Sequence, residues 1–304
     1  MLHRSQLGLT TGMTIGEKIK AYIVFTKFRL ASLVILSALS GYLFADGSSG
    51  KEIALLMIGG LLVTAASNGS NQIWERDLDK LMKRTERRPI PKGSMTVNEA
   101  YVVVIVCLVV GTYMLYLINL YSALLGLIAF ISYVFMYTPM KRVSPWAVLV
   151  GAFPGAIPPM LGAIAATNDF GLLPGVLFFV QFMWQFPHFW AIAWVLHDDY
   201  KSGGFSLLPS TSGRSKNSAF QILAYSLAMI PFSLLPWVLN FMPEFSAIGN
   251  LTLFVASVSG AIFFLYAFRL YGTLEHTDAR KLMFASFVYL PVIQFLYVID
   301  KALG

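Results

Sequence analysis

The stretch NQIWERDLDKLMKRTERRPIP, residues 71–91, carries ten charged side chains in a chain that is otherwise strongly apolar. Of the 304 residues, 57% are hydrophobic and only 12% are charged, and the mean hydropathy is +0.69. Soluble domains carry about 25% charged residues, so this composition indicates a membrane protein. A patch of charge in such a chain is expected at the membrane surface.

The apolar residues divide into stretches long enough to cross a bilayer, which takes about 20 residues as a helix. We therefore predict an all-α fold: one domain over residues 1–304, in which nine transmembrane helices surround a central cavity that opens toward cytoplasmic loops. Residues 97–139 are almost continuously apolar, and only Asn119 to Ser122 can form the turn between two spans. The predicted spans are 22–44, 53–74, 98–118, 120–139, 145–166, 171–196, 217–241, 246–271 and 282–299.

The distribution of Lys and Arg predicts the orientation, because positively charged loops stay in the cytoplasm. Of 22 basic residues, only Lys51 and Lys301 lie outside the N-terminus and the even-numbered connections. We expect residues 1–20 to be cytoplasmic and the C-terminus to be outside, in a bacterial cytoplasmic membrane, with no cleaved signal peptide. The net charge of +7 then reflects topology, so nucleic acid is not an expected partner.

The charged stretch begins at the end of the second span. If the helix continues, Asn71, Glu75 and Asp79 lie on one face at intervals of four residues. Stacked carboxylates repel one another and favour a cation between them, and hard oxygen ligands suit Mg²⁺. For Asp77 and Glu86, pairing with nearby bases is the favoured interpretation.

The single cysteine, Cys107, excludes an internal disulfide and a thiolate cluster.

A second acidic pair, Asp198 and Asp199, ends the sixth span on the same side of the membrane. Two such ends are able to hold one diphosphate through bridging Mg²⁺ ions, although a chance surface pair is the alternative. In the same span Gln181, Gln185 and His188 form one polar stripe, which predicts contact with a cavity or another helix. The fifth span is predicted to be buried because it contains three prolines, and it either lines the cavity or packs closely through glycine.

These motifs resemble the UbiA-type intramembrane prenyltransferases, which have nine transmembrane helices and two acidic cytoplasmic motifs. The family's N-x-x-x-D-x-x-x-D motif is matched by Asn71, Glu75 and Asp79, with Glu in place of the middle Asp. The following D-x-x-M-K-R-T-x-x-R-P-x-P pattern is matched from Asp79 to Pro91. A departure is Phe28, where relatives have Pro, and it puts the kink of the first span in doubt.

Segments 137–162, 184–194, 198–209 and 279–291 resemble the branch of that family that farnesylates haem, and the resemblance extends from about residue 22 to 300. It implies transfer of the farnesyl group of farnesyl diphosphate, with Mg²⁺ and one water, to a vinyl group of haem b. The expected partners are the lipid bilayer and a downstream haem-modifying enzyme. Two alternatives stay open, which are prenylation of a quinone precursor and transport of an anionic metabolite.

The resemblance also assigns roles within the site. The five expected metal ligands are Asn71, Glu75, Asp79, Asp198 and Asp199. Aromatic faces stabilise a farnesyl cation without attacking it, and Trp184 and Trp190 are candidates, together with Gln185 for the substrate. His188 is expected to contact haem iron, to accept a proton from water or to make a structural hydrogen bond. Candidates for the diphosphate oxygens are Lys83, Arg84, Arg88, Lys141, Arg142 and Lys201.

Overall fold

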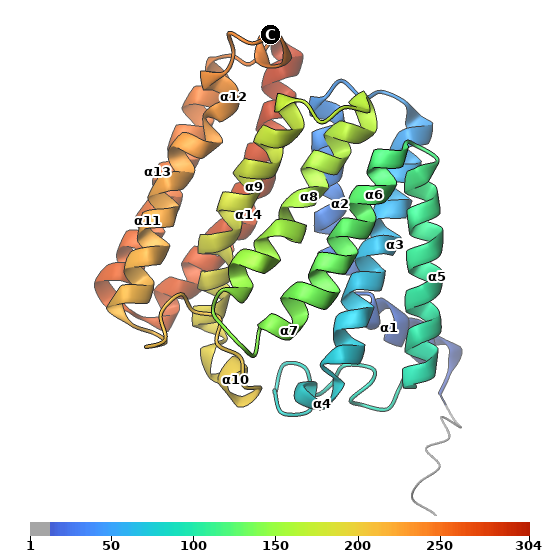
Figure 1. The fold of residues 1–304 in the computed structure, drawn as a ribbon. Coiled ribbons are helices and arrows are strands. Elements are labelled where there is room, and N and C mark those ends of the chain that lie inside the picture. Colours follow the sequence, from blue (N-terminus) through green and yellow to red (C-terminus); the bar gives the residue numbers. More distant parts are fainter. Residues whose placement is uncertain (1–12) are drawn as a thin grey trace, which may run out of the picture.

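The computed structural model describes residues 13–304, and this part of the chain is helical without β-strands (Figure 1). Expectations for residues 1–12 lie outside the described residues. The elements are α1 (Ile15–Phe25), α2 (Phe28–Phe44), α3 (Gly50–Trp74), α4 (Arg76–Asp79), α5 (Val97–Tyr116), α6 (Leu120–Ile131), the π-helix η1 (Ser132–Tyr137), α7 (Thr138–Met140), α8 (Ala147–Thr167), α9 (Leu172–Val195), α10 (His197–Ser202), α11 (Lys216–Ser233), α12 (Leu235–Val238), the 3₁₀-helix η2 (Pro243–Phe245), α13 (Asn250–Thr273) and α14 (His276–Leu303).

Eight helical segments are long and apolar enough to span a membrane, and the bent pair of α1 and α2 makes a ninth if it counts as one span. This confirms the predicted all-α, multi-span class. The side chains of α5 that face outward are large and apolar, such as Val102 and Val109, each about three-fifths exposed. In a membrane these positions face lipid. The predicted turn between α5 and α6 lies slightly earlier than expected, at residues 117–119, because residues 120–122 already belong to α6. Asn119 caps that helix by accepting a hydrogen bond from the Ser122 amide.

The first span is broken, with a bend of 48° between α1 and α2. Lys27 takes a left-handed conformation there (φ 50°), and Phe28 begins the next helix. The break exposes backbone carbonyls of α1, and amides from α3 satisfy them: Gln72 donates to the Phe25 carbonyl (2.5 Å) and Asn68 to that of Thr26 (3.4 Å). The kink thus forms without a proline at position 28, because α3 supplies its missing hydrogen bonds.

Charged connections gather at one end of the bundle. α4, α10 and the start of α1 lie at that end, and the C-terminus lies at the other (Figure 1). Near the same end the fourth span changes from α-helix to the π-helix η1 and then to α7. The π-turn widens the helix, and Thr138 donates to the Tyr133 carbonyl (2.9 Å). Thr138 is thereby turned toward the end of α3.

Two glycines allow α2 and α8 to pack backbone against backbone. An added Cβ at Gly162 would lie 1.8 Å from the Ala38 carbonyl oxygen, and one at Gly41 would lie 2.0 Å from the Pro159 oxygen. Helix α8 is among the most buried spans, which confirms the expectation for its prolines. Of the two interpretations of its small residues, close helix packing is therefore realised at these positions.

Replacement of Gly162 tests this packing. Gly162→Ala should lower the free energy of unfolding by about 1–3 kcal/mol, because the methyl group cannot be placed without separating α2 from α8. The matched control is Gly175→Ala in α9, where an added Cβ meets no atom within 4 Å. The control should be neutral or slightly stabilising, by up to about 1 kcal/mol. Thermal unfolding in detergent measures both, and equal midpoints would contradict the packing argument.

Candidate active site

The predicted acidic column is present at the junction of α3 and α4. The Glu75 amide donates to the Asn71 carbonyl (2.9 Å), and the Asp79 amide donates to that of Glu75 (2.8 Å). The interval of four residues therefore persists across the boundary between the two helices. All three side chains are buried, and Asp79 is inaccessible to solvent.

Each member of the column has a partner from another segment. Arg88 Nη1 contacts both Asp79 carboxylate oxygens, at 2.7 and 2.8 Å. Lys141 forms an ion pair with Glu75, and the Asn71 amide donates to Thr138 Oγ1 (3.3 Å). Burial raises the pKa of Asp79, although the Arg88 guanidinium opposes the shift, and burial lowers the pKa of Lys141. The cluster is compact because buried charges are costly unless they are paired.

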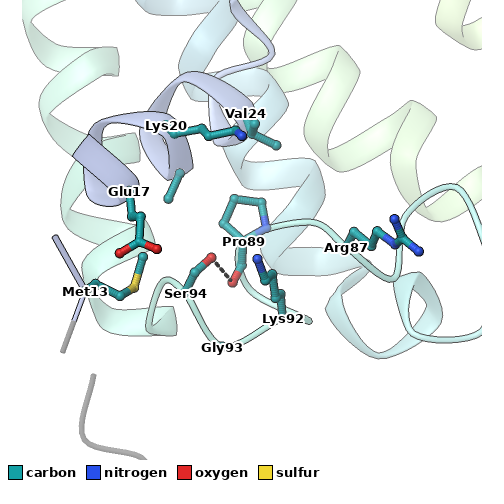
Figure 2. Close-up of a pocket in the computed structure, with 10 residues that line it drawn as sticks. Met13, Glu17, Lys20, Val24, Arg87, Pro89, Lys92, Gly93 and Ser94 are labelled. Carbon is teal, nitrogen blue, oxygen red and sulfur yellow. Dashed lines mark hydrogen bonds between the residues drawn. The ribbon is translucent and has the colours of Figure 1, made fainter. Parts of the chain in front are cut away.

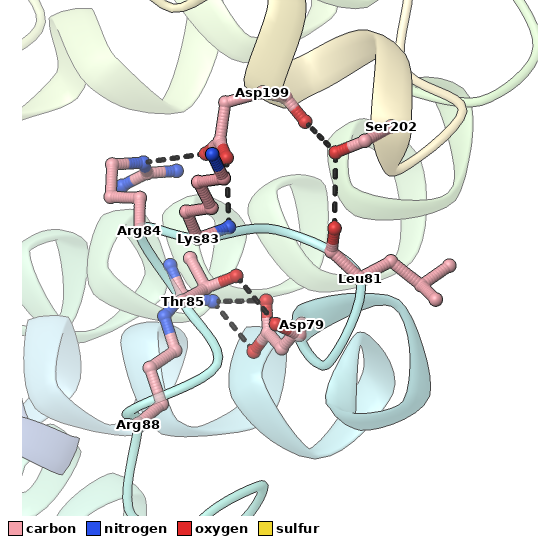
Figure 3. A network of polar contacts seen from close by, with 8 residues as sticks. All are labelled: Asp79, Leu81, Lys83, Arg84, Thr85, Arg88, Asp199 and Ser202. Carbon is pink, nitrogen blue, oxygen red and sulfur yellow. Dashed lines mark hydrogen bonds and ion pairs between the residues drawn. The ribbon is translucent and has the colours of Figure 1, made fainter.

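The second acidic segment docks on the loop that follows α4 (Figure 3). Asp199 Oδ1 accepts a hydrogen bond from the Lys83 amide (2.9 Å), and its Oδ2 lies 4.0 Å from Arg84 Nε. Ser202 Oγ donates to the Leu81 carbonyl (3.1 Å). The structure therefore brings the two acidic loops together. Asp198 differs, because its side chain is 80% exposed and pairs with Arg214 (3.0 Å) at the surface.

The remaining predicted bases are less buried. Lys83 and Lys201 have exposed side chains, and Arg84 lies over the Tyr200 ring (5.6 Å). Arg142 lines a cavity of about 540 Å³ together with Glu75 and Asp77. Asp77 itself bonds Lys80 (3.0 Å), as expected for an acid that pairs with a neighbouring base.

A second cavity, of about 410 Å³, lies between α1 and the loop after Arg87 (Figure 2). Glu17, Lys20, Lys92 and Ser94 contribute its polar lining. None of the predicted metal-ligand residues lines it. The cavity that Glu75 lines is therefore the one that belongs to the candidate site.

The donor set fits a hard divalent cation. Glu75 Oε1 and Asp199 Oδ2 are buried carboxylate oxygens that lie beside the basic groups of Lys141 and Arg84. The other ligand atoms are carboxylate and amide oxygens, which Mg²⁺ prefers. Among residues 13–304, however, no three acidic, His or Cys side chains are close enough to hold one ion. Arg88 and Lys141 neutralise the acids instead.

Comparison with known proteins identifies the family. A model described as the UbiA prenyltransferase family matches residues 34–290. The chain belongs to the UbiA prenyltransferase family. A protoheme IX farnesyltransferase from Cytophaga hutchinsonii is 45% identical over 289 residues, which cover 94% of this chain and 99% of that protein. One from Christiangramia forsetii is 47% identical and covers 91% of each.

Solved structures share the UbiA fold. That of digeranylgeranylglyceryl phosphate synthase has a TM-score of 0.76 at 17% identity, and covers 95% of this chain and 100% of that one. A UbiA homologue from Archaeoglobus fulgidus, bound to GPP and Mg²⁺, has a TM-score of 0.66 at 15% identity, and covers 92% of this chain and 99% of that one. At such identities the likeness concerns the fold alone.

The predicted polar stripe of α9 divides between two sets of contacts in this UbiA bundle. Gln181 joins a buried network with Ser37 (2.6 Å) and Gln294 (2.6 Å), and donates to the Gly155 carbonyl. His188 instead bonds Ser286 of α14 (2.8 Å). Gln185 is buried beside Gly155. Tyr289 of α14 is also buried, and its hydroxyl bonds Ser233 of α11 (2.6 Å).

The tryptophan side chains of the second half of α9 are buried inside the bundle. Trp184 donates to the Ser286 carbonyl (3.1 Å), whereas the buried indole nitrogens of Trp190 and Trp194 have no hydrogen-bond partner within residues 13–304. The Trp190 ring packs against Tyr225 (5.0 Å).

Sequence reasoning missed two residues of this candidate site. Thr138 accepts a hydrogen bond from the Asn71 amide. The position of Thr138 depends on a π-turn that no sequence pattern predicts. Lys27 lies at the bend of the first span, within electrostatic reach of Glu75, Lys141 and Arg88. In the sequence, Lys27 stands one residue before the position of the kink, and this placement was an available signal for the candidate site. Its charge entered only the prediction of the topology.

The pairing of Asp79 generates a stability prediction. Arg88→Met should lower the free energy of unfolding by about 3–5 kcal/mol, because it leaves a carboxylate buried without a partner. Arg87→Met is the matched control, since the Arg87 side chain is 89% exposed and lies 3.8 Å from Glu86. The control should change stability by less than about 0.5 kcal/mol. Thermal unfolding in detergent decides, and an equal response of the two variants would refute the role of Arg88.

Proposed function

We propose that this chain transfers the farnesyl group of farnesyl diphosphate, with addition of water, to a vinyl group of haem b. The products are haem O and diphosphate. The observation that supports this best is the buried cluster of acids and bases in which Asp79 pairs with Arg88 and Glu75 with Lys141. It lies beside the docked Asp199 loop, and the relatives that match more than nine-tenths of the chain are named protoheme IX farnesyltransferase.

Mg²⁺ is the proposed cofactor, since the A. fulgidus homologue was solved with Mg²⁺ and GPP. In this chain Asn71, Glu75, Asp79 and Asp199 would hold it, and Asp198 is the predicted ligand that the geometry supports least. A bound divalent ion neutralises the charge that develops on a departing diphosphate. The oxygen donors described above are of the type that such an ion prefers, and in this structure Arg88 and Lys141 occupy the places beside Asp79 and Glu75.

Arg88 and Lys141 have a second task in this proposal. Both are cations inside the cluster, and a bound diphosphate competes with the carboxylates for them. Further basic residues surround the same end of the bundle and strengthen its positive field. They are Lys27, Lys83, Arg84, Arg142 and Lys201. The positive charges of these bases therefore neutralise the carboxylates before the substrate binds. After binding, they neutralise the phosphate groups of the substrate.

The reaction follows from these placements. The bond between C1 of the farnesyl group and the diphosphate oxygen breaks, and its electron pair leaves with diphosphate. The terminal carbon of the haem vinyl group gives its π pair to C1, which moves positive charge to the carbon beside the porphyrin. Water adds there and loses a proton. Trp184 and Trp190 supply aromatic faces near this path and exclude other nucleophiles.

The location of the protein follows from the same charges. With the charged loops in the cytoplasm, the N-terminus is cytoplasmic and the C-terminus is outside, in a bacterial cytoplasmic membrane. Haem O then leaves within the bilayer, where a haem-modifying enzyme is able to receive it.

Product analysis tests the reaction. Membranes that contain this chain, given haem b, Mg²⁺ and farnesyl diphosphate, should form haem O, detected by chromatography and mass spectrometry. Membranes without the chain serve as the control. Prenylation of a quinone precursor with no haem O would favour the alternative UbiA activity, and the absence of any prenyl transfer would refute both.

The two adjacent aspartates provide a sharper test of the site. Asp199→Ala should reduce haem O formation at least 100-fold, because Asp199 is the acid that joins the two loops. Asp198→Ala should cost less than about tenfold, because that carboxylate faces solvent. Initial rates are measured on membranes with equal amounts of folded protein. Equal losses would show that Asp198 also enters the site.

A further inference from the structure

His188 is the one histidine within the membrane-spanning part of α9, and its ring is held on several sides. Nδ1 lies 2.8 Å from Ser286 Oγ. The Trp184 ring stacks on the imidazole at 4.1 Å and 19°. Phe189 and Phe287 contact it edge-on, at 5.6 and 5.0 Å. Within residues 13–304 the ring therefore has one hydrogen-bond partner, and it is fixed in an aromatic environment.

The hydrogen bonds of Ser286 determine which ring nitrogen carries the proton. Ser286 Oγ lies 2.6 Å from the Met283 carbonyl oxygen, a contact that requires the hydroxyl proton between the two oxygens. The hydroxyl has only this one proton, so toward His188 it acts as an acceptor. Nδ1 must then be the protonated nitrogen. In a neutral imidazole, Nε2 consequently carries a free lone pair.

The surroundings of His188 favour a neutral ligand over a base. Its contacts are a serine and three aromatic rings, and no carboxylate among them is available to stabilise an imidazolium ion. A proton accepted by Nε2 would place an unpaired charge in an apolar interior, which is costly. A histidine that binds a metal commonly donates its other N–H to an oxygen acceptor, as His188 does to Ser286.

We propose that Ser286 holds His188 in the tautomer whose Nε2 lone pair ligates the iron of the substrate haem. Phe287, which contacts the imidazole, is 41% exposed, so the aromatic cluster around His188 reaches the lipid-facing surface of the bundle. Ser286 acts through His188 and is thus a positioning residue. This assignment rests on the proposed function, because it takes haem as the substrate.

The test uses purified full-length protein in detergent, titrated with ferric haem and followed by optical absorption and electron paramagnetic resonance. Wild type should show an imidazole-ligated iron. His188→Ala should lose that signature, and added imidazole should restore it. His276→Ala is the matched control, since this histidine starts α14 away from the aromatic cluster, and it should keep the wild-type spectrum. A wild-type spectrum in His188→Ala would overturn the proposal.

Ser286 is tested in the same titration. Ser286→Ala should weaken haem binding about threefold to tenfold and give a mixture of ligation states, because one hydrogen bond that orients the ring is lost. Ser286→Thr, which keeps the hydroxyl, should restore a single state. The matched control is Ser226→Ala in α11, a buried serine whose hydroxyl has no partner. Equal responses of Ser286→Ala and Ser226→Ala would overturn the positioning role.

Haem O formation by the same preparations separates the two proposals. If wild type forms haem O but its iron spectrum does not depend on His188, iron ligation by His188 is refuted and the proposed function stands. If wild type forms no haem O, the proposed function fails, whatever the spectra show. An imidazole signature that depends on both His188 and Ser286, in protein that forms haem O, is the result expected.

Discussion

Two carboxylates lie buried at the end of α3, and a buried carboxylate persists only when a cation and hydrogen-bond donors compensate for its lost hydration. Glu75 and Asp79 obtain their cations from different parts of the chain. Arg88 comes from the loop after α4, and Lys141 follows α7. The loop from 80 to 96 and the connection from α7 to α8 are therefore both tied to α3. Asp199 ties α10 to the same loop, because its carboxylate accepts a hydrogen bond from the Lys83 amide.

Such pairs are a weak source of stability, because apolar side chains of the same size often serve a fold as well or better. Their presence here is better explained by the ligand that the cluster is arranged to receive. A diphosphate with its metal would bring both anionic and cationic partners, so the acids and bases would be able to separate while each finds a new partner of opposite charge. The paired state is then the resting form of a site that would otherwise hold uncompensated charge.

The spans were predictable from sequence because the lipid environment leaves a helix few alternatives, and because apolar runs of about 20 residues are visible without tertiary knowledge. The column of Asn71, Glu75 and Asp79 was predictable because it depends only on helical periodicity. What depended on tertiary partners was not predictable. The bend at Lys27 relies on Gln72 and Asn68 of another helix, and the orientation of Thr138 relies on a π-turn. Adjacent acids such as Asp198 and Asp199 look equivalent in sequence, but only one faces the loop.

The separation of charge and aromatic rings along α9 gives the proposed reaction its order. Val195, the end of the helix, follows His188 by seven positions, a rise of about 10 Å. Diphosphate bound at the charged end keeps the reacting farnesyl carbon near that end, and a haem iron held by His188 lies deeper. The vinyl groups lie at the edge of the porphyrin, so an iron fixed at that depth lets this edge extend toward the charged end. The two substrates then meet between the ion pairs and the histidine, where tryptophan rings replace water as the neighbours of a developing cation.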